Sequence, residues 1–174
     1  MNLKVKRNLL VLSVFLMAWW FFGQLYEAFV YTPNWDSHYN NVVEKVGLFN
    51  RFMTVTTPMN YFTPFVDLGV VIFWILFILN KDKSIKIPFL WAVIFSFVGM
   101  IVNYGLIIIP VAVKMADPVN AHNAELLENL VFQWNLWNTV RFILVGSALY
   151  FAFKVYRKVD LQYFLEKKRI SEEN

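Results

Sequence analysis

The chain has 174 residues, of which 59% are hydrophobic, 19% aromatic and 16% charged. This composition excludes an ordinary soluble domain, because the apolar residues come in blocks of about 20 or more, the length a helix needs to cross a membrane. The absence of cysteine excludes disulfides, thiolate metal ligands and a catalytic thiol. The net charge of +4 belongs to the flanks of the apolar blocks, so it indicates anionic lipid as a neighbour and requires no nucleic acid.

Four apolar blocks predict four membrane-spanning helices. In lipid the backbone must hydrogen-bond within each span, so the expected fold class is all-α. The first block is expected to be a retained span, because no small-x-small cleavage site follows it before Gln24 and Glu27. A short loop between the second and third spans predicts an up-down-up-down four-helix bundle. A single domain then fills residues 1–174, with spans at residues 9–30, 61–79, 88–113 and 130–155.

The lysines and arginines predict the orientation of these spans. Most of the 16 lie before the first span, between the second and third spans, or after the fourth. The positive-inside rule then places both termini in the cytoplasm of a multi-pass cell-membrane protein, with the two longer loops outside. The basic tail, residues 156–174, also contains Leu161, Phe164 and Leu165. This combination predicts a juxtamembrane helix that anchors the chain on anionic lipid.

Both outer loops carry helix signals. In the first, apolar residues recur at the spacing of one helical face, which predicts an amphipathic helix that lies on the outer surface or folds over the mouth of the bundle. The residues of this face are Val42, Val46, Phe49 and Met53. In the second loop, Asp117 is expected to be an N-cap with Pro118 at the first helical position. A short helix is therefore predicted to lead into the fourth span.

Polar side chains lie inside the predicted spans, and each is a candidate functional residue because a charge in lipid costs several kcal/mol. All of them fall in the outer halves of the spans, whereas the inner halves are almost purely apolar. This segregation predicts a polar chamber that opens to the outer side above an apolar floor. The candidates are Gln24 and Glu27 from the first span, Asp67 from the second, Asn103 and Tyr104 from the third, and Asn138 and Arg141 from the fourth.

Arg141 is the deepest of these candidates. Trp134, Asn138 and Arg141 share one face of the fourth span by their i, i+4 and i+7 spacing. If that face looks into the bundle, Arg141 is expected to meet Asp67 and also Glu27. One interpretation makes the Arg141–Asp67 pair an interhelical staple that only fixes which helices are neighbours. The other places these residues in a functional pocket.

The pocket interpretation assigns a role to each group. Asp67 or Glu27 would accept a proton, and Arg141 would stabilise a developing oxyanion or enolate. The ligand would be a small amphipathic or aromatic molecule, which Trp134 would hold by stacking. The remaining contacts would come from Gln24, Asn103, Tyr104 and Asn138. Neither a metal nor a cofactor is predicted, because His38 and His122 are loop residues without the neighbouring histidine of a helical metal site.

The run "WNLWNTVR" resembles the W-x-x-x-N-x-x-R pattern in the fourth helix of anthrone oxygenase-like membrane proteins, which are small four-span proteins. The matching positions are Trp134, Asn138 and Arg141. The resemblance implies cofactor-independent oxidation of an aromatic polyketide by molecular oxygen. The chain is also similar to sterol isomerase and sigma-2-type four-span proteins, where carboxylates on the first two spans face a lipid-accessible cavity. Glu27 and Asp67 match those acids, whose implied role is to hold a cationic or sterol-like amphiphile.

The sequence therefore predicts a multi-pass membrane protein whose outward-opening polar chamber binds a small amphipathic or aromatic molecule. An alternative from a different class is a non-enzymatic structural or accessory membrane subunit, in which the polar cluster only sets helix packing. A transporter would have to be a homo-oligomer, because four spans per chain are too few to build a pathway.

Overall fold

The computed structural model describes residues 2–36, 41–54 and 58–173, and it describes side chains for all of these except residues 58–63. Within these residues the secondary structure is helical, without a strand. Three helices are long and apolar enough to cross a membrane, by length and composition, and Pro64–Ile78 is a shorter apolar helix. The predicted all-α class with long apolar helices is confirmed. The three long helices, Leu3–Asp36, Lys83–Ala116 and Ala124–Glu172, all extend beyond their predicted apolar blocks.

Two of the three long helices are built from consecutive segments, some of which are π-helical or 3-10, and the third is a single α-helix. The first consists of α1 (Leu3–Tyr26), the π-helical η1 (Glu27–Tyr31) and α2 (Thr32–Asp36), and it is followed by α3 (Val42–Phe52) and α4 (Pro58–Ile78). The 3-10 turn η2 (Lys83–Ile85) leads into α5 (Lys86–Val102), the π-helical η3 (Asn103–Ala112) and α6 (Val113–Ala116). A second 3-10 turn, η4 (Pro118–Asn120), precedes α7 (Ala124–Glu172).

Short amide and carboxylate side chains begin these helices. Asn2 accepts a hydrogen bond from the Lys4 N–H at 2.8 Å, and Asn41 and Asp82 cap α3 and η2 in the same way. The prediction for Asp117 is wrong in one respect, because this residue caps only η4. The helix into the last span begins after Asn123, whose side chain accepts from the Leu126 N–H. Asn123, and not Asp117, is the N-cap of α7, because its side-chain oxygen reaches the N–H of the third residue of that helix.

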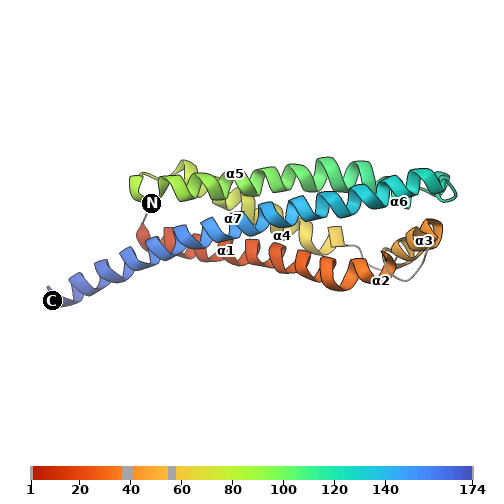
Figure 1. Ribbon diagram of the computed structural model, residues 1–174. Helices are drawn as coiled ribbons and strands as arrows, with labels where there is room; N and C mark the ends of the chain where they lie inside the picture. Colours follow the sequence, from red (N-terminus) through yellow and green to blue (C-terminus); the bar gives the residue numbers. More distant parts are fainter. Residues whose placement is uncertain (1, 37–40, 55–57, 174) are drawn as a thin grey trace.

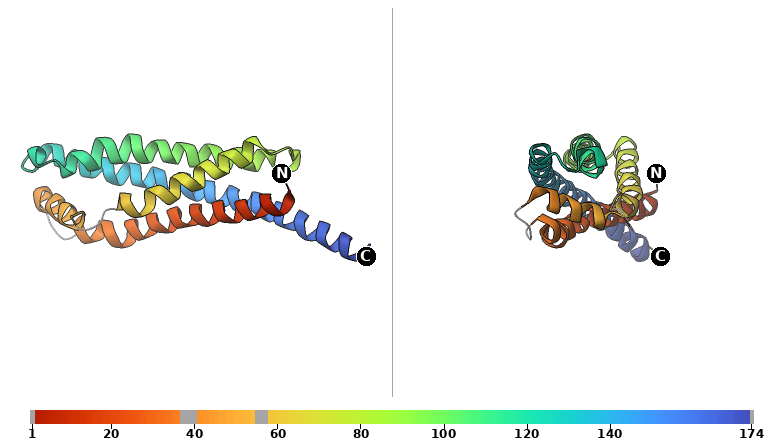
Figure 2. Two further views of the ribbon diagram at one scale, coloured as in Figure 1. Left: turned by 180° about the vertical axis from the view of Figure 1, so that it is seen from behind. Right: turned by 90° about the vertical axis from the view of Figure 1, so that its right-hand side faces the viewer.

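The four helices α1, α4, α5 and α7 lie side by side, and chain direction reverses from each to the next (Figure 1). Each has two main neighbours, in the order α1, α4, α5, α7 and back to α1, as Figure 2 also shows. α4 is therefore diagonally opposite α7. Both termini lie at one end, α3 lies at the other, and the predicted tail helix is the last part of α7 itself (Figure 1).

Three clusters of buried apolar residues fill the space between the helices. The cluster at the end with the termini includes Leu10, Phe73 and Phe89, and the middle cluster is centred on Trp20 and Val145. The third cluster lies at the opposite end and contains the predicted apolar face of α3. Val42, Val46 and Phe49 of that face are buried, and Met53 packs beside them. The amphipathic helix is confirmed, and it folds over the end of the bundle.

α1 and α4 approach each other most closely at Gly69. A Cβ atom at this position would lie 2.9 Å from the Cβ atom of Leu16 on α1. Real Cβ atoms do not come this close, so any larger residue would push the two helices apart. This contact lies on the side of the bundle away from α7. The candidate site lies on the other side, between the first long helix and α7.

Candidate functional site

Arg141 is the centre of the polar cluster, and it is 7% exposed. Its Nη2 donates to Oε2 of Glu27 at 2.6 Å and also to Oδ1 of Asn138. Its Nη1 donates to Oδ1 of Asn103. Three helices, α1–η1, η3 and α7, therefore meet at one guanidinium. Charge-assisted hydrogen bonds of this kind are about twice as strong as neutral ones, so the arginine holds the three helices in register.

The expected Arg141–Asp67 pair does not form. Asp67 lies on α4, which is diagonally opposite α7, whereas Glu27 lies on the neighbouring helix. The carboxylate of Asp67 instead accepts from the hydroxyl of Tyr104, with distances of 2.9 and 3.1 Å. Of the two acids that the sequence offers to Arg141, only Glu27 is therefore its partner.

Two of the three partners of Arg141 stand at the start of π-helical segments. Glu27 is the first residue of η1 and its carbonyl accepts from the Thr32 N–H, five residues on. Asn103 is the first residue of η3, which contains Pro110, a residue that cannot supply the N–H of a regular turn. A π-turn accommodates an extra residue and rotates the side chains that follow, and such turns are frequent at functional sites.

Two buried polar groups next to this cluster have no hydrogen-bond partner among the described residues. Gln24 is 5% exposed, and both its amide oxygen and its amide nitrogen are unpaired. Nε of Arg141 is buried and unpaired as well. A buried polar group without a partner costs about 1–3 kcal/mol, and buried unpaired atoms also occur at Ser13, Tyr31, Trp35, Asn50 and Trp134. What distinguishes Gln24 and Arg141 is that both residues border a cavity.

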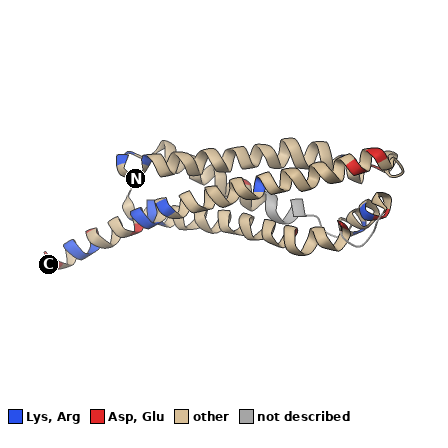
Figure 3. Ribbon diagram, viewed as in Figure 1, with Lys and Arg blue, Asp and Glu red and all other residues tan. Residues whose placement is uncertain are grey.

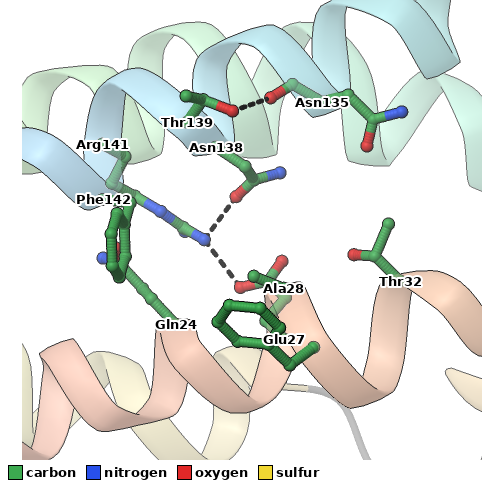
Figure 4. Close-up of a pocket in the computed structure, with 10 residues that line it drawn as sticks. Gln24, Glu27, Ala28, Thr32, Asn135, Asn138, Thr139, Arg141 and Phe142 are labelled. Atoms are coloured by element: carbon green, nitrogen blue, oxygen red, sulfur yellow. Dashed lines mark hydrogen bonds and ion pairs between the residues drawn. The ribbon is translucent and has the colours of Figure 1, made fainter.

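These groups line a cavity of about 330 Å³ between the first long helix and α7. Figure 4 shows the guanidinium of Arg141 and the carboxylate of Glu27 meeting at one end of it. Seven of the ten lining residues have polar side chains, but most of the exposed surface of the wall is apolar. The lining residues are Gln24, Glu27, Ala28, Phe29, Thr32, Asn135, Asn138, Thr139, Arg141 and Phe142.

Contacts between side chains lie at both ends of the cavity along the helix axes. On the side toward the termini, the ring of Phe142 stacks on that of Phe21 with centroids 5.1 Å apart. On the other side, Nδ2 of Asn135 donates to Oδ2 of Asp36 at 3.2 Å, and Oδ1 of the same carboxylate is 2.9 Å from Nζ of Lys45 on α3. Asp36 thus connects the wall of the cavity to α3, the helix that folds over this end of the bundle.

The predicted aromatic wall at Trp134 is wrong. Trp134 does face inward with Arg141, but it lies two turns nearer the capped end, where α3 fills the interior. Its indole packs edge-on against Phe49 and Trp35, with centroids 5.2 and 6.3 Å away, and it does not line the cavity. The ring next to the arginine is Phe142, the residue that follows it in the chain.

The remaining predicted site residues divide between the two sides of the bundle. Gln24, Glu27, Asn138 and Arg141 line the cavity, and Asn103 supports Arg141 from behind. Asp67 and Tyr104 form their own pair away from the cavity. His122 is exposed and His38 lies outside the described residues. In the part of the chain that the structure describes, no three metal-binding side chains come together.

Sequence reasoning missed the apolar and hydroxyl residues of the site. Ala28, Phe29 and Thr32 follow Glu27 on the first long helix, and Thr139 and Phe142 flank Arg141. Their only sequence signal is their position within two turns of a charged residue inside an apolar block.

No protein-family model, no curated protein and no solved structure matches this chain. Its function has to be argued from the chemistry of the cavity.

Proposed function

We propose that the chain crosses a membrane four times, through α1, α4, α5 and α7, with both termini in the cytoplasm. Figure 3 shows lysines and arginines gathered at the end that holds the termini, whereas the stretch between the two ends is almost free of charge. Large apolar side chains cover the outside of that stretch. Those exposed by more than half include Phe22, Phe29, Ile78, Ile109, Phe132 and Ile143. Lipid is the solvent that fits such a surface.

The cavity between α1–η1 and α7 binds a small amphipathic molecule in this proposal. The observation that carries it is a charged pair between helices that lines a cavity, with the unpaired amide of Gln24 and the unpaired Nε of Arg141 enclosed just behind the cavity surface. A small rotation of the Gln24 side chain would let its amide hydrogen-bond to a polar ligand in the cavity. A staple that only fixes helix packing requires Arg141 and its acceptors, but it requires neither the cavity nor Gln24.

Native mass spectrometry of the protein in a mild detergent tests this function. Wild type is expected to carry a bound small molecule, and Gln24→Leu is expected to lose it. Gln133→Leu is the matched control, because Gln133 lies on the same bundle, hydrogen-bonds to Asn129 and does not line the cavity. Wild type that is empty in several lipids and detergents would contradict the proposal.

A proton-transfer enzyme is the second candidate, favoured by the carboxylate of Glu27 on the cavity wall. If the ligand has an acidic C–H or O–H, its proton would pass to Glu27 and the resulting anion would take the place of the carboxylate beside Arg141. The site stays neutral throughout, which a low-dielectric environment favours. In an anthrone oxygenase-like reaction, the anion would then react with molecular oxygen, so that a CH₂ group and O₂ give a carbonyl and water.

Oxygen uptake with anthrone as the probe distinguishes this second candidate from simple binding. The enzyme hypothesis expects uptake by wild type that is lost in Glu27→Gln and unchanged in Glu44→Gln, an exposed position on α3. Equal uptake by wild type and Glu27→Gln would exclude Glu27 as the base. No uptake by wild type would leave binding as the function and exclude anthrone as the substrate.

A further inference from the structure

The cavity is a window between two helices, bounded by two polar bridges. At its inner edge Glu27 meets Arg141, and at its outer edge Asp36 meets Asn135. Glu27 and Asp36 are nine positions apart on the first long helix, about 13 Å at the helical rise per residue. Their partners on α7 are six positions apart, about 9 Å. Thr32 lies opposite Asn135 between the bridges (Figure 4).

Access from the aqueous side along the bundle axis is blocked. Trp35 and Phe49 pack against each other above the window with ring centroids 5.3 Å apart, and each is 1% exposed. The expected opening toward the outer side is therefore replaced by an opening at the flank. The most exposed wall residues are those on this flank, Ala28, Phe29 and Thr139, and Phe29 is 76% exposed.

The residues around the window mark it as lipid-facing. Phe22 is one to two turns from the mouth on α1, and Phe132 and Leu136 precede it on α7. All three are exposed and large. In the proposed topology the window therefore opens into the outer leaflet of the membrane.

We propose that this window admits the head group of an uncharged, hydroxyl-bearing lipid from the outer leaflet, while the acyl chain stays in the bilayer along Phe29. This inference rests on the proposed binding function and adds the ligand class and the route. The charges of Arg141 and Glu27 already compensate each other at 2.6 Å, so a charged head group would introduce an unbalanced charge into a dry site.

The polar groups of the cavity wall determine the chemistry of the head group. The wall includes the hydroxyls of Thr32 and Thr139 and the amides of Asn135 and Asn138, which can donate and accept hydrogen bonds. A hydroxyl group also both donates and accepts, so an uncharged head group with hydroxyls matches this wall. The volume of about 330 Å³ is at the small end of ligand pockets, so it accommodates a head group and not a whole lipid.

Photo-crosslinking in liposomes tests both the class and the route. The probe is a monoacylglycerol with a diazirine in its acyl chain, and the competitors are monoolein, oleate and free glycerol. We expect crosslinks on the peptide that contains Phe29, with competition by monoolein and not by oleate or glycerol. Ala28→Trp fills the mouth of the window and is expected to reduce crosslinking about tenfold. Val30→Trp is the matched control, because Val30 is exposed on the same turn and does not line the cavity.

Each contrary outcome identifies the step that fails. Equal competition by oleate would overturn the uncharged head group, and equal competition by glycerol would overturn the lipid route. Ala28→Trp that crosslinks like wild type would also exclude the lateral route. Absence of crosslinks to wild type would exclude this lipid class, and the proposed function would still stand if native mass spectrometry had found another molecule in the cavity. An empty cavity in both experiments would remove the proposed function itself.

Discussion

The two ends of this helical molecule satisfy their polar groups differently. At the end with the termini, the interior is an apolar cluster in which Ser13 is a buried polar exception, and the charged groups form bonded pairs on the rim. Arg7 contacts Asp160 at 2.5 Å, and Nε2 of Gln162 donates to Asp82 at 2.9 Å. In the other half, the charged pair Glu27–Arg141 lies between helices, beside an amide without a partner and a cavity.

This difference separates what the fold requires from what a ligand requires. The rim pairs hold α1, the loop after α4 and α7 together at low cost, because their groups remain close to water. A polar cluster within the apolar span costs free energy, and unpaired groups add to that cost. The proposed ligand site therefore lies in the half whose polar groups are the more costly to bury.

The largest expected effect comes from removing the cation of the buried pair. Arg141→Met leaves the partly buried carboxylate of Glu27 without a partner, so we expect a loss of up to about 3 kcal/mol in the free energy of unfolding. Thermal unfolding in detergent measures this loss. Arg51→Met is the matched control, because Arg51 is exposed at the end of α3, and its effect is expected to be near zero.

The double variant Arg141→Met/Glu27→Gln separates loss of the pair from loss of packing. Because the uncompensated charge is gone, the double variant is expected to recover most of the stability that Arg141→Met loses. A double variant as unstable as Arg141→Met would show that the arginine contributes through its bulk and its two asparagine contacts.

Adding volume on the two sides of the bundle gives the next largest effect. In Gly69→Val the new Cβ atom would lie 2.9 Å from the Cβ atom of Leu16. We expect this clash to lower the free energy of unfolding by about 1–3 kcal/mol. Ala28→Leu adds the same number of carbon atoms at the mouth of the cavity and is expected to leave stability nearly unchanged. Unfolding midpoints of the two variants in the same detergent provide the test. Equal destabilisation would mean that the window is as tightly packed as the α1–α4 contact.

Residues whose position depends on periodicity were predictable from the sequence. The apolar blocks appear as long helices, and the i, i+4, i+7 pattern of Val42, Val46 and Phe49 identifies the buried face of α3. Part of the polar set around Arg141 was also predictable, because groups that are costly in lipid must find one another, but Asp67 and Tyr104 form a separate pair. Gln24, Glu27, Asn103 and Asn138 do gather there.

The partner of Arg141 was not predictable, because it depends on the order of the helices around the bundle. Periodicity shows which face of α7 points inward, but not that α1 lies beside it and α4 opposite. The π-helical turns at Glu27 and Asn103 rotate the side chains that follow and leave no signal in the sequence apart from Pro110. The inward-facing side of α7 that carries Trp134 was predictable. The packing of Trp35 and Phe49 against Trp134 was not, so Trp134 was wrongly expected beside the ligand.

Replacing the unpaired amide is expected to have a smaller effect of opposite sign. Gln24→Leu removes two buried atoms without partners, so the ligand-free protein is expected to gain about 1 kcal/mol in stability. The same variant loses the stabilisation that a bound ligand gives to wild type. Thermal unfolding with and without added lipid measures both effects. A loss of stability in the ligand-free variant would indicate that Gln24 has a structural role.

The smallest effect concerns the rim at the end with the termini. The hydrogen bond from Gln162, together with that from Ser84, lowers the pKa of Asp82. A carboxyl with a lowered pKa in the folded state stabilises the protein above its unfolded pKa of about 3.9, and the stabilisation disappears as the pH falls through the folded value. Because this contact is exposed, its contribution is expected to be about 1 kcal/mol or less. Gln162→Leu should therefore unfold at a lower temperature than wild type at pH 7, and the difference should disappear as the pH falls below about 4. A difference that persists in acid would show that Gln162 acts by packing and that the rim pairs do not depend on the charge of Asp82.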